Sequence, residues 1–174
     1  MIHCYMEVEV GVLARTFYIT ITKSKTMGKP GTHKITFTAS IEEVPRMCES
    51  ITEAARKAGM QDRNLWKLET AVDEALTNIC CYGYQCKQDG KIWINWETEG
   101  GFFCLTIEDT GIPFDQTQPT TPNFTQNICD RKIGGLGRHI MRNFLDDMKY
   151  QYNGERNCLT LIKSLQEEKK AAVS

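Results

Sequence analysis

The sequence lacks any long apolar run. Its most apolar stretches are short ones such as Gly101 to Leu105, whereas a helix that crosses a membrane needs about 18 apolar residues or more. The chain also begins without the basic start, apolar segment and small-residue cleavage site of a secretory signal. We therefore expect a soluble cytoplasmic protein that has no membrane partner.

The sequence also has few histidines and no excess of basic residues. The chain has three histidines, and none of its eight cysteines has the Cys-x-x-Cys spacing of zinc sites, which argues against a Cys/His metal site. Lys and Arg number 21 against 22 Asp and Glu, so the net charge of −1 supplies no basic excess for binding a phosphate backbone. Direct nucleic acid binding is not expected, and the cysteines are expected to be reduced thiols, several of them in the core.

The composition that is present is ordinary for a globular protein, with 41% hydrophobic and 25% charged residues. A length of 174 residues predicts one domain with some additional chain. The periodic patterns place that domain at residues 32–165. Residues 1–31 are expected to be an N-terminal extension or linker whose residues 14–22 can form a strand, and residues 166–174 a C-terminal tail.

Apolar periodicity predicts the secondary structure of the domain. Three- and four-residue spacings predict helices that begin after Ser40, at Asp62 and at Gly134, with Ser40 and Glu43 as a capping box and Asp62 as a cap. A loop at 110–133 is expected to be a functional lid or a disordered segment. Strands are predicted at 34–38, 91–97, 102–108, 148–152 and 158–165. This order predicts an α+β, two-layer sandwich: a mixed, mostly antiparallel sheet covered by helices on one face.

The first candidate site lies on the second predicted helix. Glu74 and Asn78 are four residues apart, so both project from one helix face. An asparagine carbonyl is a neutral oxygen ligand suited to Mg²⁺ that carries nucleotide phosphates, and a neighbouring carboxylate can deprotonate a nucleophile. Taken alone, a solvated helix face is the simpler explanation of these residues.

Asp109 and Gly111 form the second candidate site, directly after a predicted strand. A carboxylate at the end of a strand can accept a hydrogen bond from an amino group such as the exocyclic amine of adenine. Glycine allows a flat ligand to approach the backbone closely. The same residues can equally form an ordinary turn.

The run Gly134-Gly135-Leu136-Gly137 opens the last predicted helix and is the third candidate site. Backbone N–H groups at a helix start can cradle a phosphate, and the flanking Lys132 and Arg138 add positive charge. A plain glycine-rich junction with exposed basic neighbours is the alternative. The sequence has no Walker A pattern and no Gly-x-Gly-x-x-Gly fingerprint, so a bound nucleotide requires another fold.

These three motifs, in this order, resemble the N, G1 and G2 boxes of the histidine-kinase-like ATPase superfamily (GHKL), which also holds gyrase B, Hsp90 and MutL. Within it, the chain is similar to the bacterial anti-sigma factor serine/threonine kinases of partner-switching systems. Residues 141–150 and 157–163 resemble the same group.

The resemblance implies ATP and Mg²⁺ as cofactors and a role for each motif. Asn78 would bind Mg²⁺ and the nucleotide, and Glu74 would be the catalytic base. Asp109 would bind the adenine amine, and Gly111 would line the adenine pocket. The residues implied on the phosphate side are Lys132, Gly134, Gly135, Leu136, Gly137 and Arg138.

Two positions depart from the family pattern. Tyr82 stands where many relatives have a histidine, four residues after the asparagine of the first motif. Arg156 and Asn157 replace a Gly-Thr pair that is common at the start of the last strand, which leaves one contact on the adenine side open.

The expected function is that of an ATP- and Mg²⁺-dependent serine/threonine kinase and anti-sigma factor. The resemblance implies that it phosphorylates a small anti-sigma-factor antagonist, sequesters a sigma factor and forms a homodimer. The alternative is a nucleotide-sensing protein-binding module without kinase turnover. A third possibility, an ATP hydrolase that works through dimer closure, is disfavoured because the chain length leaves no room for the transducer domain of such proteins.

Overall fold

The computed structural model describes residues 33–88, 90–118 and 135–167. The predicted strand at 14–22 and most of the predicted tail lie outside these residues. The helices are α1 (Val44–Lys57), α2 (Asp62–Asn78) and α3 (Gly135–Phe144), with short helical turns η1 (Ile41–Glu43) and η2 (Ile79–Gly83). The strands are β1 (His33–Thr38), β2 (Lys91–Glu99), β3 (Phe102–Asp109), β4 (Asp147–Tyr152) and β5 (Asn157–Ser164).

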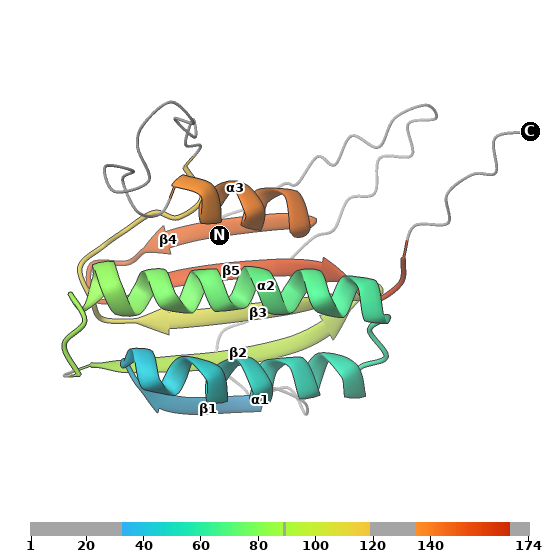
Figure 1. The fold of residues 1–174 in the computed structure, drawn as a ribbon, viewed down its shortest axis with the longest axis horizontal. Helices are drawn as coiled ribbons and strands as arrows, with labels where there is room; N and C mark the ends of the chain where they lie inside the picture. Colours follow the sequence, from blue (N-terminus) through green and yellow to red (C-terminus); the bar gives the residue numbers. More distant parts are fainter. Residues whose placement is uncertain (1–32, 89, 119–134, 168–174) are drawn as a thin grey trace, which may run out of the picture. The chain divides into compact units, whose positions relative to one another are not determined.

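The five strands form one sheet in the order β1-β2-β3-β5-β4. Figure 1 shows α1, α2 and α3 on the same face of this sheet, with α2 between the other two. The predicted α+β sandwich is therefore confirmed. The sequence predicts a mixed, mostly antiparallel sheet, and all four pairings among the described strands are antiparallel.

The core lies between the sheet and the helices. Burial alternates along β3, where Phe103, Leu105 and Ile107 are fully buried, as expected for a strand with one face on the core. Leu68 and Leu76 of α2 are at most 1% exposed and belong to the same apolar cluster. This packing fixes the position of α2, which carries the first candidate site.

Neither predicted cap makes a side-chain capping hydrogen bond. Ser40 takes the cap position of η1, which leads directly into α1, and Pro45 occupies the first turn of α1. The Glu43 carboxylate accepts hydrogen bonds from Arg46 instead. At α2, Gln61 takes the cap position and Asp62 is the first helical residue, with no side-chain cap.

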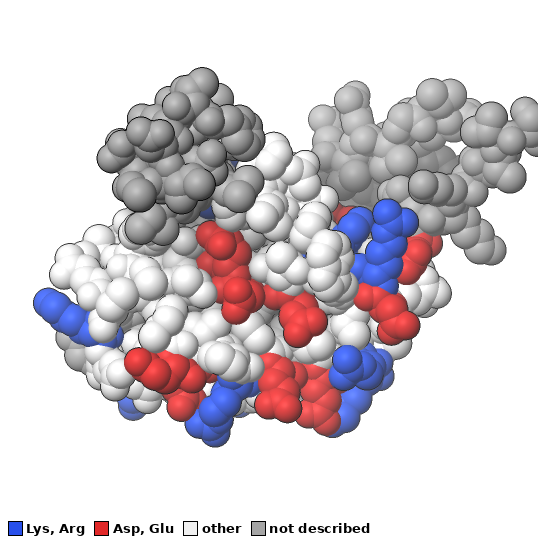
Figure 2. All heavy atoms as spheres, in the orientation of Figure 1, with Lys and Arg blue, Asp and Glu red and all other residues white. Residues whose placement is uncertain are grey.

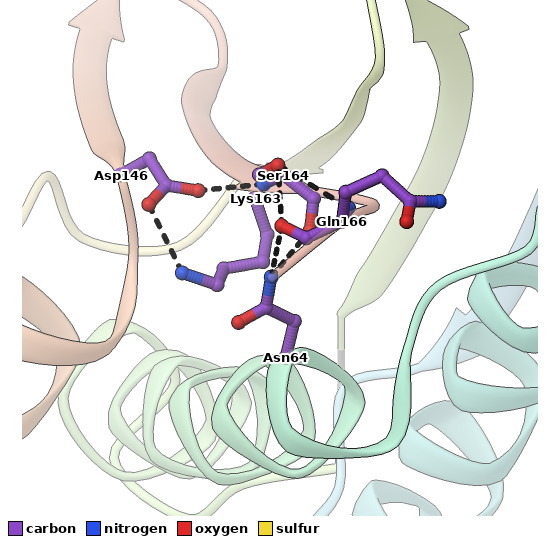
Figure 3. Close-up of polar contacts among 5 residues, drawn as sticks. All are labelled: Asn64, Asp146, Lys163, Ser164 and Gln166. Atoms are coloured by element: carbon purple, nitrogen blue, oxygen red, sulfur yellow. Dashed lines mark hydrogen bonds and ion pairs between the residues drawn. The ribbon is translucent and has the colours of Figure 1, made fainter. Parts of the chain in front are cut away.

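The C-terminal end of β5 holds the start of α2 in place (Figure 3). Asn64, which is buried, donates hydrogen bonds from Nδ2 to the carbonyl oxygens of Ser164 and Gln166 over 3.0 and 2.9 Å. Lys163 is also buried, and its Nζ lies 3.0 Å from Oδ1 of Asp146 at the turn between α3 and β4. These polar contacts therefore link α2, β5 and the turn between α3 and β4.

The cysteines of the described residues are free thiols, and two of them, Cys48 and Cys80, are buried. Burial raises the pKa of each of these two thiols to about 12, so neither is reactive near neutral pH. The prediction that several cysteines serve as core residues is confirmed for this pair. Cys4 and Cys129 lie outside the described residues.

The described surface is mixed in charge. Figure 2 shows acidic and basic side chains interspersed among uncharged ones on the helical face. Within residues 33–88, 90–118 and 135–167, no helix is long and apolar enough to cross a membrane.

Candidate functional site

The last two turns of α2 bring Glu74 and Asn78 together. Asn78 is 3% exposed, and its Nδ2 donates a hydrogen bond to Oε1 of Glu74 over 2.9 Å. A carboxylate can only accept, so this bond turns the amide nitrogen toward Glu74 and the carbonyl oxygen away from it. The predicted shared helix face is confirmed, and the solvated-face alternative fails for Asn78 because that residue is buried.

The first turn of α3 meets Glu74. A Cβ built at Gly137 would overlap the carboxylate group of Glu74, so any other residue at position 137 would force this carboxylate to move. The first and third motifs therefore lie side by side. Gly135 and Leu136 lie in the same first turn, whereas Lys132 and Gly134 fall outside the described residues.

Asp109, the last residue of β3, is 4% exposed. Its Oδ1 accepts two hydrogen bonds of 2.8 Å, from the backbone N–H of Gly111 and from Nδ2 of Asn157. Burial raises the pKa of this carboxyl above its ordinary value, and the two hydrogen bonds oppose that rise. Among the described residues no donor reaches Oδ2, so the second oxygen is available to a ligand.

Gly111 is required by the backbone of η2. A Cβ at Gly111 would lie 2.7 Å from the carbonyl oxygen of Gly83, and that oxygen accepts a hydrogen bond from Ile112 N–H over 2.9 Å. A backbone atom held by a hydrogen bond cannot move aside cheaply. The glycine thus permits the segment after β3 to pack on the end of η2.

Asn157 completes the surroundings of Asp109 at the position that the sequence left open. Besides its bond to Asp109, its Nδ2 donates to the carbonyl oxygen of Gly111 over 3.0 Å. The Tyr150 hydroxyl donates to its Oδ1 over 2.6 Å. The replacement of a Gly-Thr pair therefore supplies a side chain that holds Asp109 directly.

A small cavity lies beside Asp109. Its volume is about 10 Å³, which is the room of roughly one water molecule. The segment after β3 contributes Ile112, Phe114 and Gln116 to its lining. The lining residues are Ile79, Gly83, Asp109, Ile112, Phe114, Gln116, Tyr150 and Leu159.

Gln116 is a site residue that the sequence analysis did not single out. It is 2% exposed, its Oε1 accepts from Nδ2 of Asn78 over 3.2 Å, and its Nε2 donates to the carbonyl oxygen of Ala75 over 3.3 Å. A single glutamine in a loop has no periodic or motif signal. Only the packing of the loop against α2 reveals it.

Arg138 and Tyr82 both lie against the Phe114 ring. The Arg138 guanidinium carbon lies 5.4 Å from the centroid of the Phe114 ring, and the Tyr82 ring lies 5.3 Å from it between centroids. The nearby Arg142 Nη1 donates to the carbonyl oxygen of Thr117 over 2.8 Å. Side chains of α3 therefore hold the segment after β3, and Arg138 is engaged there.

The side chains around Asn78 are suited to a metal ion whose other ligands are water molecules and phosphate oxygens. Among the described residues, no group of three or more His, Cys, Asp or Glu side chains could hold a metal ion. A single amide oxygen, that of Asn78, instead fits Mg²⁺, which usually keeps several waters and is bound together with substrate phosphates.

A comparison with known protein families decides the relationship. The model of the histidine kinase-like ATPase domain matches residues 37–163. The chain belongs to the histidine kinase-like ATPase family. The predicted resemblance to this superfamily is thereby confirmed.

Relatives of this chain carry names from the predicted subgroup. The chain is 35% identical over 107 residues to the "Anti-sigma F factor" of Bacillus velezensis, covering 60% of this chain and 73% of that one. It is 32% identical over 83 residues to the "Anti-sigma F factor" of Halalkalibacterium halodurans, covering 48% and 57%. It is 31% identical over 94 residues to the "Serine/threonine-protein kinase BtrW" of Bordetella bronchiseptica, covering 54% and 66%. The matched part thus spans between 57% and 73% of these relatives, and the predicted resemblance to anti-sigma factor kinases is confirmed.

Proposed function

We propose that this protein is a Mg²⁺- and ATP-dependent serine/threonine kinase and anti-sigma factor. Its substrate would be a small anti-sigma-factor antagonist, and its second partner a sigma factor that it sequesters. The names of the relatives support this class of activity and these classes of partner. The same proposal includes a homodimer. It also includes a cytoplasmic location, because a sigma factor acts on transcription in the cytoplasm.

The observation that carries the proposal is the meeting of Glu74, which is hydrogen-bonded to Asn78, with the first turn of α3. A phosphoryl-transfer site needs a base, a metal ligand and a phosphate cradle within reach of one another, and little else. We assign the base to Glu74, which would take the proton of the attacking serine hydroxyl. We assign the cradle to the backbone N–H groups of Gly135 and Gly137, and the metal ligand to Asn78 Oδ1.

The adenine end of the proposed site lies at Asp109. Its Oδ2 would accept a hydrogen bond from the exocyclic amine, and Gly111 would form the wall beside the base. Bound Mg²⁺ would neutralise phosphate charge. Because the cavity beside Asp109 is smaller than a purine, binding requires Ile112 and Phe114 to move outward. Lys132, Gly134, Leu136 and Arg138 complete the proposed phosphate side.

The test has two stages. Thermal unfolding with Mg²⁺ and ATP at 100 times the dissociation constant should show a gain of about 2.7 kcal/mol, and no gain would refute nucleotide binding. Radiolabelled ATP, Mg²⁺ and the cognate antagonist should then give phosphate transfer. Glu74→Ala should abolish transfer while ATP still binds, and Asn78→Ala should impair both.

A nucleotide-sensing module without turnover is the alternative outcome. In that case partner binding would depend on ATP, would persist with a nonhydrolysable analogue and would be unchanged by Glu74→Ala. Phosphate transfer that survives Glu74→Ala would instead remove the base assignment and leave the kinase proposal standing.

A further inference from the structure

Gln116 connects three groups of the site in a fixed donor and acceptor order. Ala75 offers a backbone carbonyl oxygen, which can only accept, so the amide of Gln116 must turn its nitrogen toward it. The carbonyl oxygen of Gln116 then faces Asn78 and accepts from Nδ2. The orientation of the Gln116 amide is thus set by the backbone of α2.

The orientation of the Asn78 amide is set by its hydrogen-bond partners in the same way. Its amide nitrogen has two hydrogens, and two acceptors face that nitrogen: Oε1 of Glu74 at 2.9 Å and Oε1 of Gln116 at 3.2 Å. A flipped Asn78 amide would place its oxygen against two other oxygens and lose both bonds. Since Asn78 and Gln116 are only 3% and 2% exposed, water cannot readily replace either acceptor.

We propose that Gln116 is a positioning residue that holds the carbonyl oxygen of Asn78 toward the metal. This inference rests on the proposed function, because it concerns the Mg²⁺ that would accompany ATP. Glu74 alone also favours this orientation, but its side chain is half-buried and is the group we assign to proton transfer. Gln116 supplies a second, neutral acceptor that is anchored on the backbone of α2.

The experiment measures how much Mg²⁺ tightens ATP binding. Calorimetric titration of the full chain with ATP, in saturating Mg²⁺ and in EDTA, gives two dissociation constants whose ratio reports the metal contribution. Gln116→Met removes both polar atoms at similar length. We expect it to reduce this ratio about tenfold, the lower end of what loss of an orienting partner costs in metal affinity, with the EDTA value changed less than about twofold.

Gln118→Met is the matched control. Gln118 lies two residues further along, is exposed, and donates from Nε2 to Asp115 Oδ2 on the same loop. The same substitution there should leave both dissociation constants unchanged. If Gln116→Met does not fold, Gln116→Leu removes the same polar atoms and takes its place in the comparison.

The outcomes separate the two proposals. A Gln116 variant that keeps the full Mg²⁺ ratio, or that weakens binding equally with Mg²⁺ and with EDTA, overturns the positioning role while the nucleotide site stands. A wild-type protein that binds no ATP in either condition overturns the proposed function and this inference with it. A reduced ratio at position 116 with an unchanged ratio at position 118 supports the assignment.

Discussion

Asn157 donates a hydrogen bond from Nδ2 to Oδ1 of Asp109 over 2.8 Å, and the two residues are paired directly across β5 and β3. The bond holds a buried carboxylate that burial alone would drive toward its neutral form. It occupies one oxygen only. Asp109 therefore sits in the core at an electrostatic cost, with its second oxygen left for recognition.

Asp109→Asn should stabilise the protein at neutral pH and weaken ATP binding. Folding raises the pKa of Asp109. At a pH just above the ordinary pKa of an aspartate, the Asp109 carboxyl therefore keeps its proton in the folded state, whereas the unfolded chain has lost it. The stability that this carboxyl contributes is therefore present at acidic pH and is lost as the pH rises through the folded pKa. Removing the charge should add about 1 kcal/mol at pH 7, measured by urea unfolding, and much less near about pH 4.

The same variant should bind ATP about ten- to a hundredfold more weakly, as loss of a hydrogen bond to a charged group predicts. The control is Asp62→Asn. Asp62 is the first residue of α2, at the end of the helix opposite Asn78, so ATP affinity should be unchanged. Lower stability of Asp109→Asn at pH 7 would contradict the account of the buried charge. Unaltered ATP affinity would contradict the adenine assignment.

Gly111→Ala should destabilise the protein by about 1 to 3 kcal/mol, the usual cost of forcing extra atoms into a packed site. The added Cβ would lie 2.7 Å from a backbone oxygen of Gly83. Gly83→Ala is a matched control, since the nearest atom to its Cβ would lie 3.8 Å away, at ordinary contact distance. Equal unfolding midpoints for the two variants in urea would show that the close approach at Gly111 does not constrain the fold.

Gly137→Ala should lower phosphate transfer by about a hundredfold or more, the contribution expected of a positioned base. Its Cβ would displace the Glu74 carboxylate, which is the flexible end of a side chain, so the fold should tolerate the change. The measurement is the initial rate of phosphate transfer, with the urea unfolding midpoint as the check that the fold is kept. A folded Gly137→Ala variant that transfers phosphate at the wild-type rate would contradict the role of this close approach.

The Lys163 and Asp146 pair should show an asymmetric effect on stability. Asp146→Ala leaves the buried Lys163 ammonium without its partner and removes an acceptor of the Ser164 N–H. Breaking buried pairs is costly, but Asp146 has a side chain 37% exposed, so we expect about 1 to 3 kcal/mol. Lys163→Met removes the buried charge itself and should cost less. Chemical unfolding of both variants checks the order, and a larger loss for Lys163→Met would contradict it.

The predictions from sequence succeeded where structure is local. Alternation gave the strands within one or two residues, and the four-residue spacing placed Glu74 and Asn78 on one face of α2. The capping bonds predicted at Ser40 and Asp62 are absent for different reasons. At the first, η1 and Pro45 form the helix start; at the second, the backbone N–H of Gln61 is hydrogen-bonded to the distant Leu165 carbonyl oxygen.

By itself the sequence determined the order of the elements, which follows from periodicity and spacing that act within a few residues. It also carried three motifs whose order resembles that of a known ATPase superfamily. Only the tertiary structure decided that Gly137 meets Glu74, that Asn157 holds Asp109 and that Gln116 faces Asn78. The bonded pairs lie 48 and 38 residues apart, and they form because the sheet and helices pack into one core, which no local pattern records.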